Sequence, residues 1–145
     1  MGWTVDLVTG VAELLDAAGA GVWNPTGIYD VDDTAIVVGP TIPQTPDRIV
    51  CLTPYPVEDT PGLPEVVIAI QVRCRGTTVP RTAEDQADAV YDVLHGASGL
   101  TLGGVPVAQM WRQSSAPLGP DTSGRAERSD NYYLRAARSA TYSTD

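Results

Sequence analysis

The pattern that decides the fold lies in the last third of the chain, which reads PVAQMWRQSSA at residues 106–116 and RAERSDNYYLRAARS at residues 125–139. Aromatic and long charged side chains at this density fit a pleated surface better than a mobile tail. Both runs are therefore predicted to be long strands. The segment between them, PLGPDTSG at residues 117–124, is rich in proline and glycine and predicts the turn that joins them.

The segments just before this strand pair predict a hairpin and a helix. Two glycines at residues 103–104 separate the apolar run at 100–102 from the next strand, as in a two-residue hairpin. Thr82 and Asp85 resemble a capping box at the start of a helix, and Gly96 supplies its stop. The helix has an apolar stripe at the right spacing, made of Ala83, Ala87, Val90, Tyr91 and Leu94.

The first half of the chain predicts the rest of a single domain over residues 1–145. Residues 4–18 have helical spacing, residues 35–38 and 48–53 predict short buried strands, and residues 65–75 alternate as a strand with one face in the core. Proline-rich connections between them should be stiff. The sequence therefore predicts an α+β fold: an antiparallel or mixed sheet of five to six strands, with two helices packed on it and a long C-terminal strand pair.

Charge divides the chain into two parts. All nine basic residues are arginine, against eighteen acids, so the formal net charge is −9. Residues 1–65 hold ten acids and one arginine and account for all of it, whereas residues 66–145 are balanced. Proteins that track DNA phosphates display basic stripes, so any DNA is expected to pass without specific binding. We expect no secretory signal, because the N-terminus has no basic stretch and carries acids at Asp6, Glu13 and Asp16. We expect no membrane span, because no apolar run reaches ~18 residues.

No pattern predicts catalysis. Asp30, Asp32 and Asp33 lack the glycine and the distal glutamate of a calcium loop, so they are expected to be solvated turn acids. The single histidine, His95, is expected at a helix C-terminus, where an imidazolium interacts favourably with the last carbonyl groups. No nucleophile motif accompanies it. We therefore expect no catalytic residue and no cofactor.

The two cysteines, Cys51 and Cys74, fall inside strand-like runs and are expected to be buried free thiols. A disulfide between them would require adjacent strands in one particular register. Together with His95 they are the only nitrogen or sulfur ligands, so a closed zinc site within one chain is excluded. No metal site is expected.

The candidate site is a protein interface, because arginine, tyrosine and tryptophan are the residues that most often anchor such interfaces. Loops on a rigid scaffold also carry a disproportionate share of binding residues. The alternative is that one face of the strand pair is core and the other an ordinary salt-bridged surface. The predicted interface residues are Trp111, Arg112, Arg125, Arg128, Tyr132 and Tyr133 on the strand pair, and Leu118 and Asp121 on the loop between the strands.

The same segments resemble the tail terminator, or minor capsid, proteins of long-tailed bacteriophages. The resemblance rests on AVYDVLHG at residues 89–96, on QMWR at 109–112, and on PLG at 117–119 followed by GRAERSDNY at 124–132. It implies a non-enzymatic virion protein, assembled in the host cytoplasm, that forms a ring, usually of six subunits. Such a ring caps the growing tail tube and then joins it to the head connector. The implied partners are further copies of the chain, the tail tube protein and the head completion or connector proteins.

Two other functions stay open at this point. Another neck component, such as a head completion protein, shares the non-enzymatic character and differs only in its partners. A small cytoplasmic enzyme or ligand-binding domain would need a pocket that converges on Asp30, Asp32, Asp33 or His95.

Overall fold

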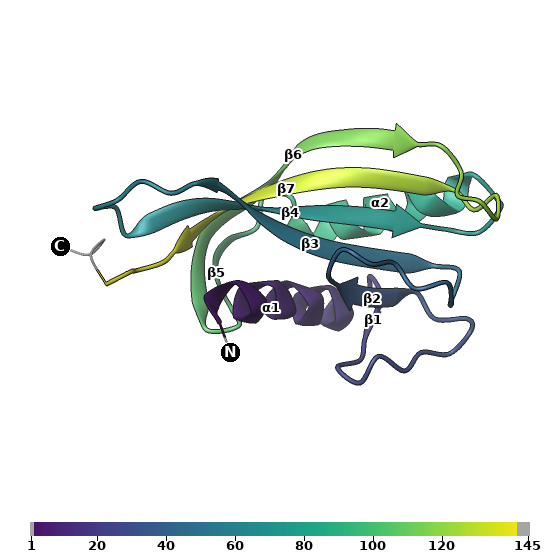
Figure 1. Ribbon diagram of the computed structural model, residues 1–145, viewed down its shortest axis with the longest axis horizontal. Coiled ribbons are helices and arrows are strands. Elements are labelled where there is room, and N and C mark those ends of the chain that lie inside the picture. Colours follow the sequence, from purple (N-terminus) through teal and green to yellow (C-terminus); the bar gives the residue numbers. More distant parts are fainter. Residues whose placement is uncertain (1, 142–145) are drawn as a thin grey trace.

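The computed structural model describes residues 2–141 as two helices and a seven-stranded mixed sheet (Figure 1). The sheet order is β1-β2-β3-β4-β7-β6-β5. The first three strands are parallel to one another, and all other neighbours are antiparallel. The elements are α1 (Trp3–Ala17), β1 (Val22–Trp23), β2 (Ala35–Val38), β3 (Ile49–Glu58), β4 (Glu65–Arg75), α2 (Arg81–Leu94), β5 (Ser98–Leu102), β6 (Val105–Leu118) and β7 (Glu127–Ala137).

The predicted α+β class, the mixed sheet, the two helices and the long C-terminal strand pair are confirmed, but the predicted number of five to six strands was too low. The strand that the sequence did not reveal is β1, which pairs in parallel with β2 through Val22 and Trp23. Two residues are too few to show a strand periodicity. Only the tertiary pairing identifies them.

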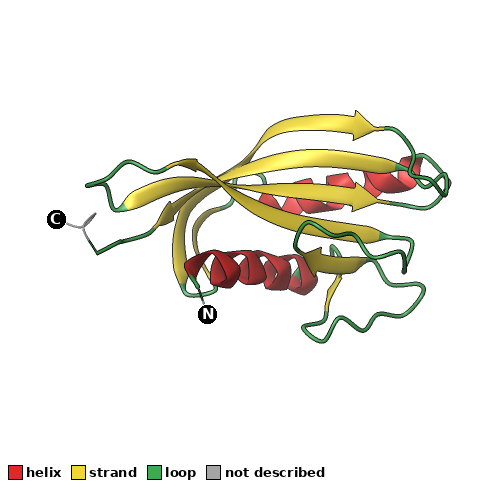
Figure 2. Cartoon of the chain, in the orientation of Figure 1, coloured by secondary structure: helices red, strands yellow, loops and turns green. Residues whose placement is uncertain are grey.

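Both helices pack on one face of the sheet (Figure 2). α1 contacts β1, β2, β3, β5 and β6, and α2 contacts β4, β6 and β7. The alternation predicted for residues 65–75 is confirmed, since Ile68, Ile70, Val72 and Cys74 are buried under the helices. The core continues into β7 through Tyr132, Leu134 and Ala136. Within residues 2–141, no helix covers the opposite face of the sheet.

Part of that second face is covered by the proline-rich connection between β2 and β3. Ala35, Ile49 and Cys51 form a small buried cluster there, and Tyr29 and Ile42 are among the side chains that pack against it. The stiff extended segment predicted by the prolines is thus packed down on the sheet end. Beyond this cover the helix-free face carries mostly polar and aromatic side chains.

α1 and the β5–β6 turn approach each other at backbone distance. A Cβ atom on Gly10 would lie 2.4 Å from the backbone nitrogen of Gly103, and one on Gly103 would lie 1.8 Å from the carbonyl oxygen of Asp6. Gly103 also has a φ of +57°, which other residues rarely adopt. Glycine inside a helix is unfavourable. The close approach of the two backbones explains why glycine nevertheless stands at position 10 of α1.

The start of α2 differs from the prediction. The helix begins at Arg81 with Pro80 at the N-cap position, so Thr82 lies in the first turn and does not cap it. The Thr82 hydroxyl instead accepts the Thr77 amide at 2.8 Å and donates to the Val79 carbonyl oxygen at 2.7 Å. It therefore ties down the β4–α2 connection. Across residues 2–141, neither helix has the length and apolarity needed to cross a membrane.

Candidate interaction surface

The helix-free face of the sheet places aromatic and polar side chains from four strands side by side. Along β7 the alternation buries Tyr132 against the helices and leaves Tyr133 partly exposed on the other side. Tyr133 lies between Trp111 of β6 and Ala69 of β4, and Ala69 in turn lies beside Tyr55 of β3. We call this surface the open face; it consists of Tyr55, Arg73, Trp111, Ser114, Asn131, Tyr133 and Arg135.

An aromatic cluster occupies the β6–β7 side of the open face. The rings of Trp111 and Tyr133 meet edge to face, with centroids 6.0 Å apart and planes at 63°. The guanidinium carbon of Arg135 lies 5.4 Å from the centre of the Trp111 ring, within the range of a cation–π contact. The Trp111 indole nitrogen donates to Oε1 of Gln113 at 3.0 Å. These contacts connect the side chains of the cluster within one chain.

A hydrogen-bond chain crosses the remaining width of the open face. The Tyr55 hydroxyl donates to Oδ1 of Asn131 at 2.9 Å, and Nδ2 of Asn131 donates to the Ser114 hydroxyl at 3.0 Å. The chain spans β3, β4, β7 and β6, because Ala69 on β4 is too small to block it. Burial raises the pKa of the Tyr55 hydroxyl, and the nearby Tyr133 adds to the shift. Tyr55 is therefore a hydrogen-bond donor at neutral pH.

The open face differs from the helix layer in charge. Arg73 pairs with Glu127 at 2.7 Å, and Arg135 has no ion-pair partner within residues 2–141. The solvent side of α2 instead exposes three acids that have no ion-pair partner within residues 2–141: Asp85, Asp88 and Asp92. Surfaces with excess negative charge repel one another when copies associate. The open face is thus better suited to a contact between copies than the helix layer.

Two predicted interface arginines belong to a network between α2 and the C-terminal strand pair. Arg128 pairs with Glu84 at 2.7 Å and with Asp130 at 3.1 Å, and it also donates to the Ser115 hydroxyl. Arg112 lies 3.5 Å from Asp130 and places its guanidinium 4.4 Å from the Tyr91 ring centre. Asp130 is only 2% exposed. The network fixes α2 to the sheet.

His95 closes this network at the C-terminus of α2, where it was predicted to lie. Its ring stacks on Tyr91, with centroids 4.5 Å apart, and its Nδ1 accepts the backbone amide of Arg112 at 3.1 Å. The residue connects a helix end to a strand.

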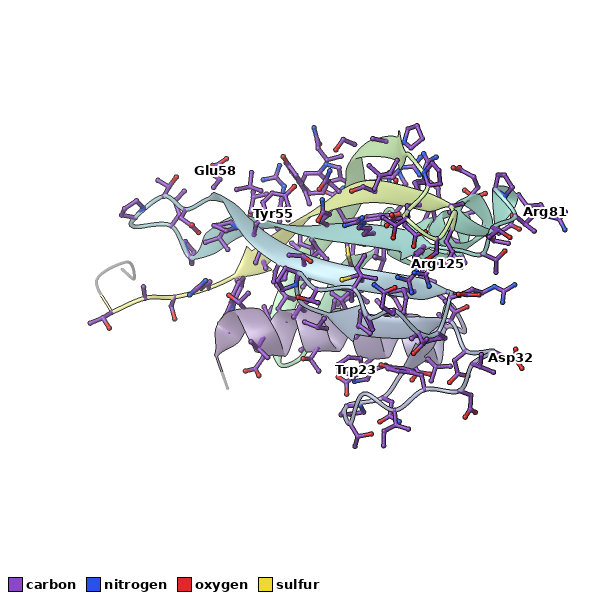
Figure 3. The ribbon with its side chains drawn as sticks, turned by 45° about the vertical axis from the view of Figure 1, so that its right-hand side comes forward. Trp23, Asp32, Tyr55, Glu58, Arg81 and Arg125 are labelled. Atoms are coloured by element: carbon purple, nitrogen blue, oxygen red, sulfur yellow. The ribbon has the colours of Figure 1, made fainter. Side chains whose placement is uncertain are left out.

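Arg125 forms a second network at the end of the sheet where the β6–β7 loop lies (Figure 3). It is 7% exposed and pairs with Asp121 at 2.8 Å and with Asp47 at 3.2 Å. It also donates to the Gln44 carbonyl oxygen at 2.7 Å. Arg75, buried beside it, donates to the carbonyl oxygens of Asp47 and Pro46 at 2.9 and 2.8 Å. Burial lowers the pKa of Arg75, and the neighbouring Arg125 acts in the same direction.

The structure separates the eight predicted interface residues into two groups. Trp111 and Tyr133 lie together on the open face, and Leu118, 39% exposed, ends β6 at its rim. The other five serve the fold within one chain, through burial or ion pairs: Arg112, Arg125, Arg128, Tyr132 and Asp121. The alternative of a salt-bridged strand pair thus applies to the second group, through contacts within one chain. The role of the first group between subunits stays a prediction.

Sequence reasoning missed Tyr55, which completes the open face from β3. Its signal was weak, because Tyr55 stands between Pro54 and Pro56 and the predicted strand ended at residue 53. A strand that carries prolines is confined to special positions such as a sheet edge. The extension of β3 to Glu58 therefore had to come from pairing with β4.

Of the residues considered for an enzyme, Asp32 and Asp33 share a cavity, and His95 lies apart from them. Asp32 and Asp33 line a cavity of about 430 Å³ together with Asp16, near the end of α1. His95 is engaged elsewhere, with Tyr91 and Arg112. Within residues 2–141 no three histidine, cysteine or carboxylate side chains are placed to hold a metal ion. A larger cavity, about 690 Å³, lies between the β3–β4 turn and the C-terminal segment, with Asp59 and Arg138 in its lining.

Comparison with known proteins supplies a family model and a related fold. The model of a family described as bacteriophage tail terminator protein matches residues 14–138. A chain of the virion of a native gene transfer agent particle has a similar fold, with a TM-score of 0.63 and 17% sequence identity, over 95% of this chain and 100% of that one. No curated protein sequence matches significantly.

Proposed function

The chain belongs to the family of bacteriophage tail terminator proteins, and on that premise we propose that it forms a ring of six copies that caps the tail tube and joins it to the head connector. The observation that carries the proposal is the family match over residues 14–138, nearly the whole chain. The family is one of structural phage proteins, so the chain is a structural virion protein. The ring, its position in the neck and its partners are the proposal.

The open face supports contacts between copies. It holds Trp111 and Tyr133 in a fixed arrangement and carries an arginine without an ion pair within residues 2–141. Side chains that are already ordered lose less conformational entropy on binding. Aromatic residues and arginine are also the usual anchors of interfaces.

Charge limits how six copies can meet. At −9 per chain a ring of six carries a formal charge of −54. The acids of α2 must then point away from one another by more than a Debye length of roughly 8 Å, or face arginines of a neighbour. A negative lumen would let DNA pass without adhering. The proposed partners are further copies of this chain, the tail tube protein and head completion or connector proteins.

Mass photometry of the purified protein, with negative-stain imaging, tests the ring. Six chains of 15.3 kDa give a particle of about 92 kDa with six-fold symmetry. Mixing the particle with purified tail tubes tests the cap, because a terminator should decorate one tube end only. The proposal would be rejected if the protein stayed monomeric at all concentrations or if the particle did not bind the ends of tail tubes.

A second candidate is another neck component, such as a head completion protein. The open face fits this candidate equally well. Binding to DNA-filled heads without binding to tail tubes would favour this candidate.

A further inference from the structure

Within residues 2–141, one edge of the sheet is left unpaired and has little protection. β5 pairs with β6 only as far as Gln109, and the amides of Met110 and Arg112 are taken by Ala97 and His95. From residue 113 to Leu118, no described strand pairs with the outer side of β6, and all six residues are exposed. None of the six is charged. Strand edges in soluble proteins are usually protected by charge, proline or cover, and here only Pro117 acts in that way.

The other long strand with a free edge is protected. β3 extends past its partner β2 from residue 53 to Glu58. This stretch contains Pro54 and Pro56, which have no amide hydrogen to offer, and ends in a charge. The contrast between the two edges indicates that the β6 edge is covered in the assembled protein.

The connection between β1 and β2 carries the most exposed large apolar side chains of the described chain. Ile28 is 74% exposed and Val31 is 80% exposed. Three carboxylates, Asp30, Asp32 and Asp33, stand among them without an ion pair in residues 2–141. We call residues 24–34 the β1 loop.

The β1 loop and the free β6 edge lie at the same level along the strands, at opposite edges of the sheet. The strand register aligns Val38 of β2 with Leu52, Val72 and Asp130, and then with Ser115 of β6. Another row aligns Ala35 with Leu118 in the same way. A rotation that repeats the chain side by side therefore brings the β1 loop of one copy to the β6 edge of the next. Such a head-to-tail contact closes into a ring when the rotation closes.

We propose that the β1 loop of one copy packs against residues 113–118 of β6 in the neighbouring copy. This inference rests on the proposed ring and names two surfaces that join its subunits in addition to the open face. Ile28 and Val31 cover the apolar end of the edge at Leu118. In this contact, Asp32 of one copy faces Arg81 of the neighbouring copy. Arg81 is exposed, has no ion pair in residues 2–141 and lies at the same end of the molecule as Asp32 (Figure 3).

Cross-linking between two variants tests this contact. One preparation carries Val31→Cys and the other Ala116→Cys, both at exposed positions, and a short bis-maleimide joins thiols after the two are mixed. The native cysteines are buried and should not react. We expect a cross-linked dimer in the mixture at least tenfold above either variant alone. The matched control pairs Ala116→Cys with Leu63→Cys, an exposed position on the distant β3–β4 turn.

Mass photometry of the same mixture separates the possible failures. A ring that assembles while the Val31→Cys mixture gives no more cross-link than the Leu63→Cys control overturns this inference and leaves the proposed function standing. Absence of any ring in the wild type overturns both. As a second measurement, Val31→Asp should raise the assembly midpoint concentration at least tenfold, whereas Leu63→Asp should leave it unchanged. Equal effects of the two variants would also reject the contact.

Discussion

The hydroxyl group of Tyr55 in β3 reaches across β4 and donates a 2.9 Å hydrogen bond to Oδ1 of Asn131 in β7. The bond runs diagonally, because the register pairs Tyr55 with Ala69 and Asn131 with Gln71, and Ala69 leaves room for it because it has no side chain beyond Cβ. The bond links strands that are not neighbours in the sheet. It makes the open face a connected unit, and the first prediction concerns its contribution to stability.

Replacing Tyr55 with Phe should lower the free energy of unfolding by about 0.5–1.5 kcal/mol, the usual net value of one hydrogen bond. Urea denaturation followed by circular dichroism measures it. Tyr133→Phe is the matched control, because the Tyr133 hydroxyl has no hydrogen bond within residues 2–141. Equal losses in the two variants would show that the Tyr55–Asn131 bond contributes nothing specific.

Truncation of the aromatic cluster should weaken assembly and leave the monomer folded. Trp111→Ala removes the ring that Tyr133 and Arg135 both contact, and we expect a loss of about 2 kcal/mol or more per interface, as for other aromatic anchors. Mass photometry over a dilution series measures the loss. Val5→Ala, an exposed apolar residue on α1, is the control. Undiminished assembly of Trp111→Ala would place the contact elsewhere.

Gly103→Ala should destabilise the fold by about 1–3 kcal/mol, because the new methyl group collides with the α1 backbone at Asp6. Thermal unfolding measures this. Gly119→Ala is the comparison, since a Cβ atom there meets nothing within 4 Å. A Gly103→Ala protein as stable as Gly119→Ala would mean that α1 moves away at little cost.

Asp121→Asn should make stability less dependent on acid pH. Burial acts to raise the pKa of the Asp121 carboxyl, but hydrogen bonds from Arg125 and Ser123 outweigh it, so this pKa is lowered in the folded chain. Such a carboxylate stabilises the fold above the unfolded pKa of about 3.9, and the stabilisation is lost as pH falls through the folded pKa. The wild type should therefore exceed the variant in stability at pH 7, with a difference that shrinks in acid.

Urea denaturation at several pH values between neutral and acid measures the difference. Asp85→Asn, which removes an exposed acid of α2, serves as the control. A difference between wild type and Asp121→Asn that stays constant down to strongly acid pH would contradict the assigned role of the Asp121–Arg125 pair.

Both cysteines should be inert in the folded protein. Burial raises the pKa of the Cys51 and Cys74 thiols, so little reactive thiolate forms. A thiol reagent should label neither residue until the chain unfolds. Replacing both with Ala should cost about 1–3 kcal/mol through lost burial and should not affect assembly. Rapid labelling of the native protein would show that the sheet opens near these residues.

The free thiols illustrate what the sequence determined. Apolar alternation placed Cys74 on the core face of β4, and this is confirmed because a two-residue period needs no knowledge of partners. Cys51 stands opposite Arg73 in the register, so the two thiols lie on opposite faces and cannot form a disulfide without rearrangement. Helix spacing likewise located both helices to within one or two residues. These properties depend on local periodicity alone.

The candidate surface was decided by the tertiary structure. Two irregularities in the β6–β7 register, after Val107 and after Arg112, shift which β6 side chains face the helices. Trp111 and Arg112 were predicted together as interface residues, although neighbours in a strand face opposite sides; Trp111 lies on the open face and Arg112 against α2.

The ion pairs of the arginines were also decided by the tertiary structure, because their partners lie far away in the sequence. Composition predicted that they would be important, but Arg125 binds Asp47 and Gln44, about eighty residues away in the chain. Arg128 binds Glu84, which is forty-four residues away. Periodicity along a chain carries no information about such distant partners. The sequence alone determined both helices, most of the strands and their buried faces. Only the folded chain decided the pairing of β1, the length of β3, which charges are paired within the chain and which surface is left for a neighbour.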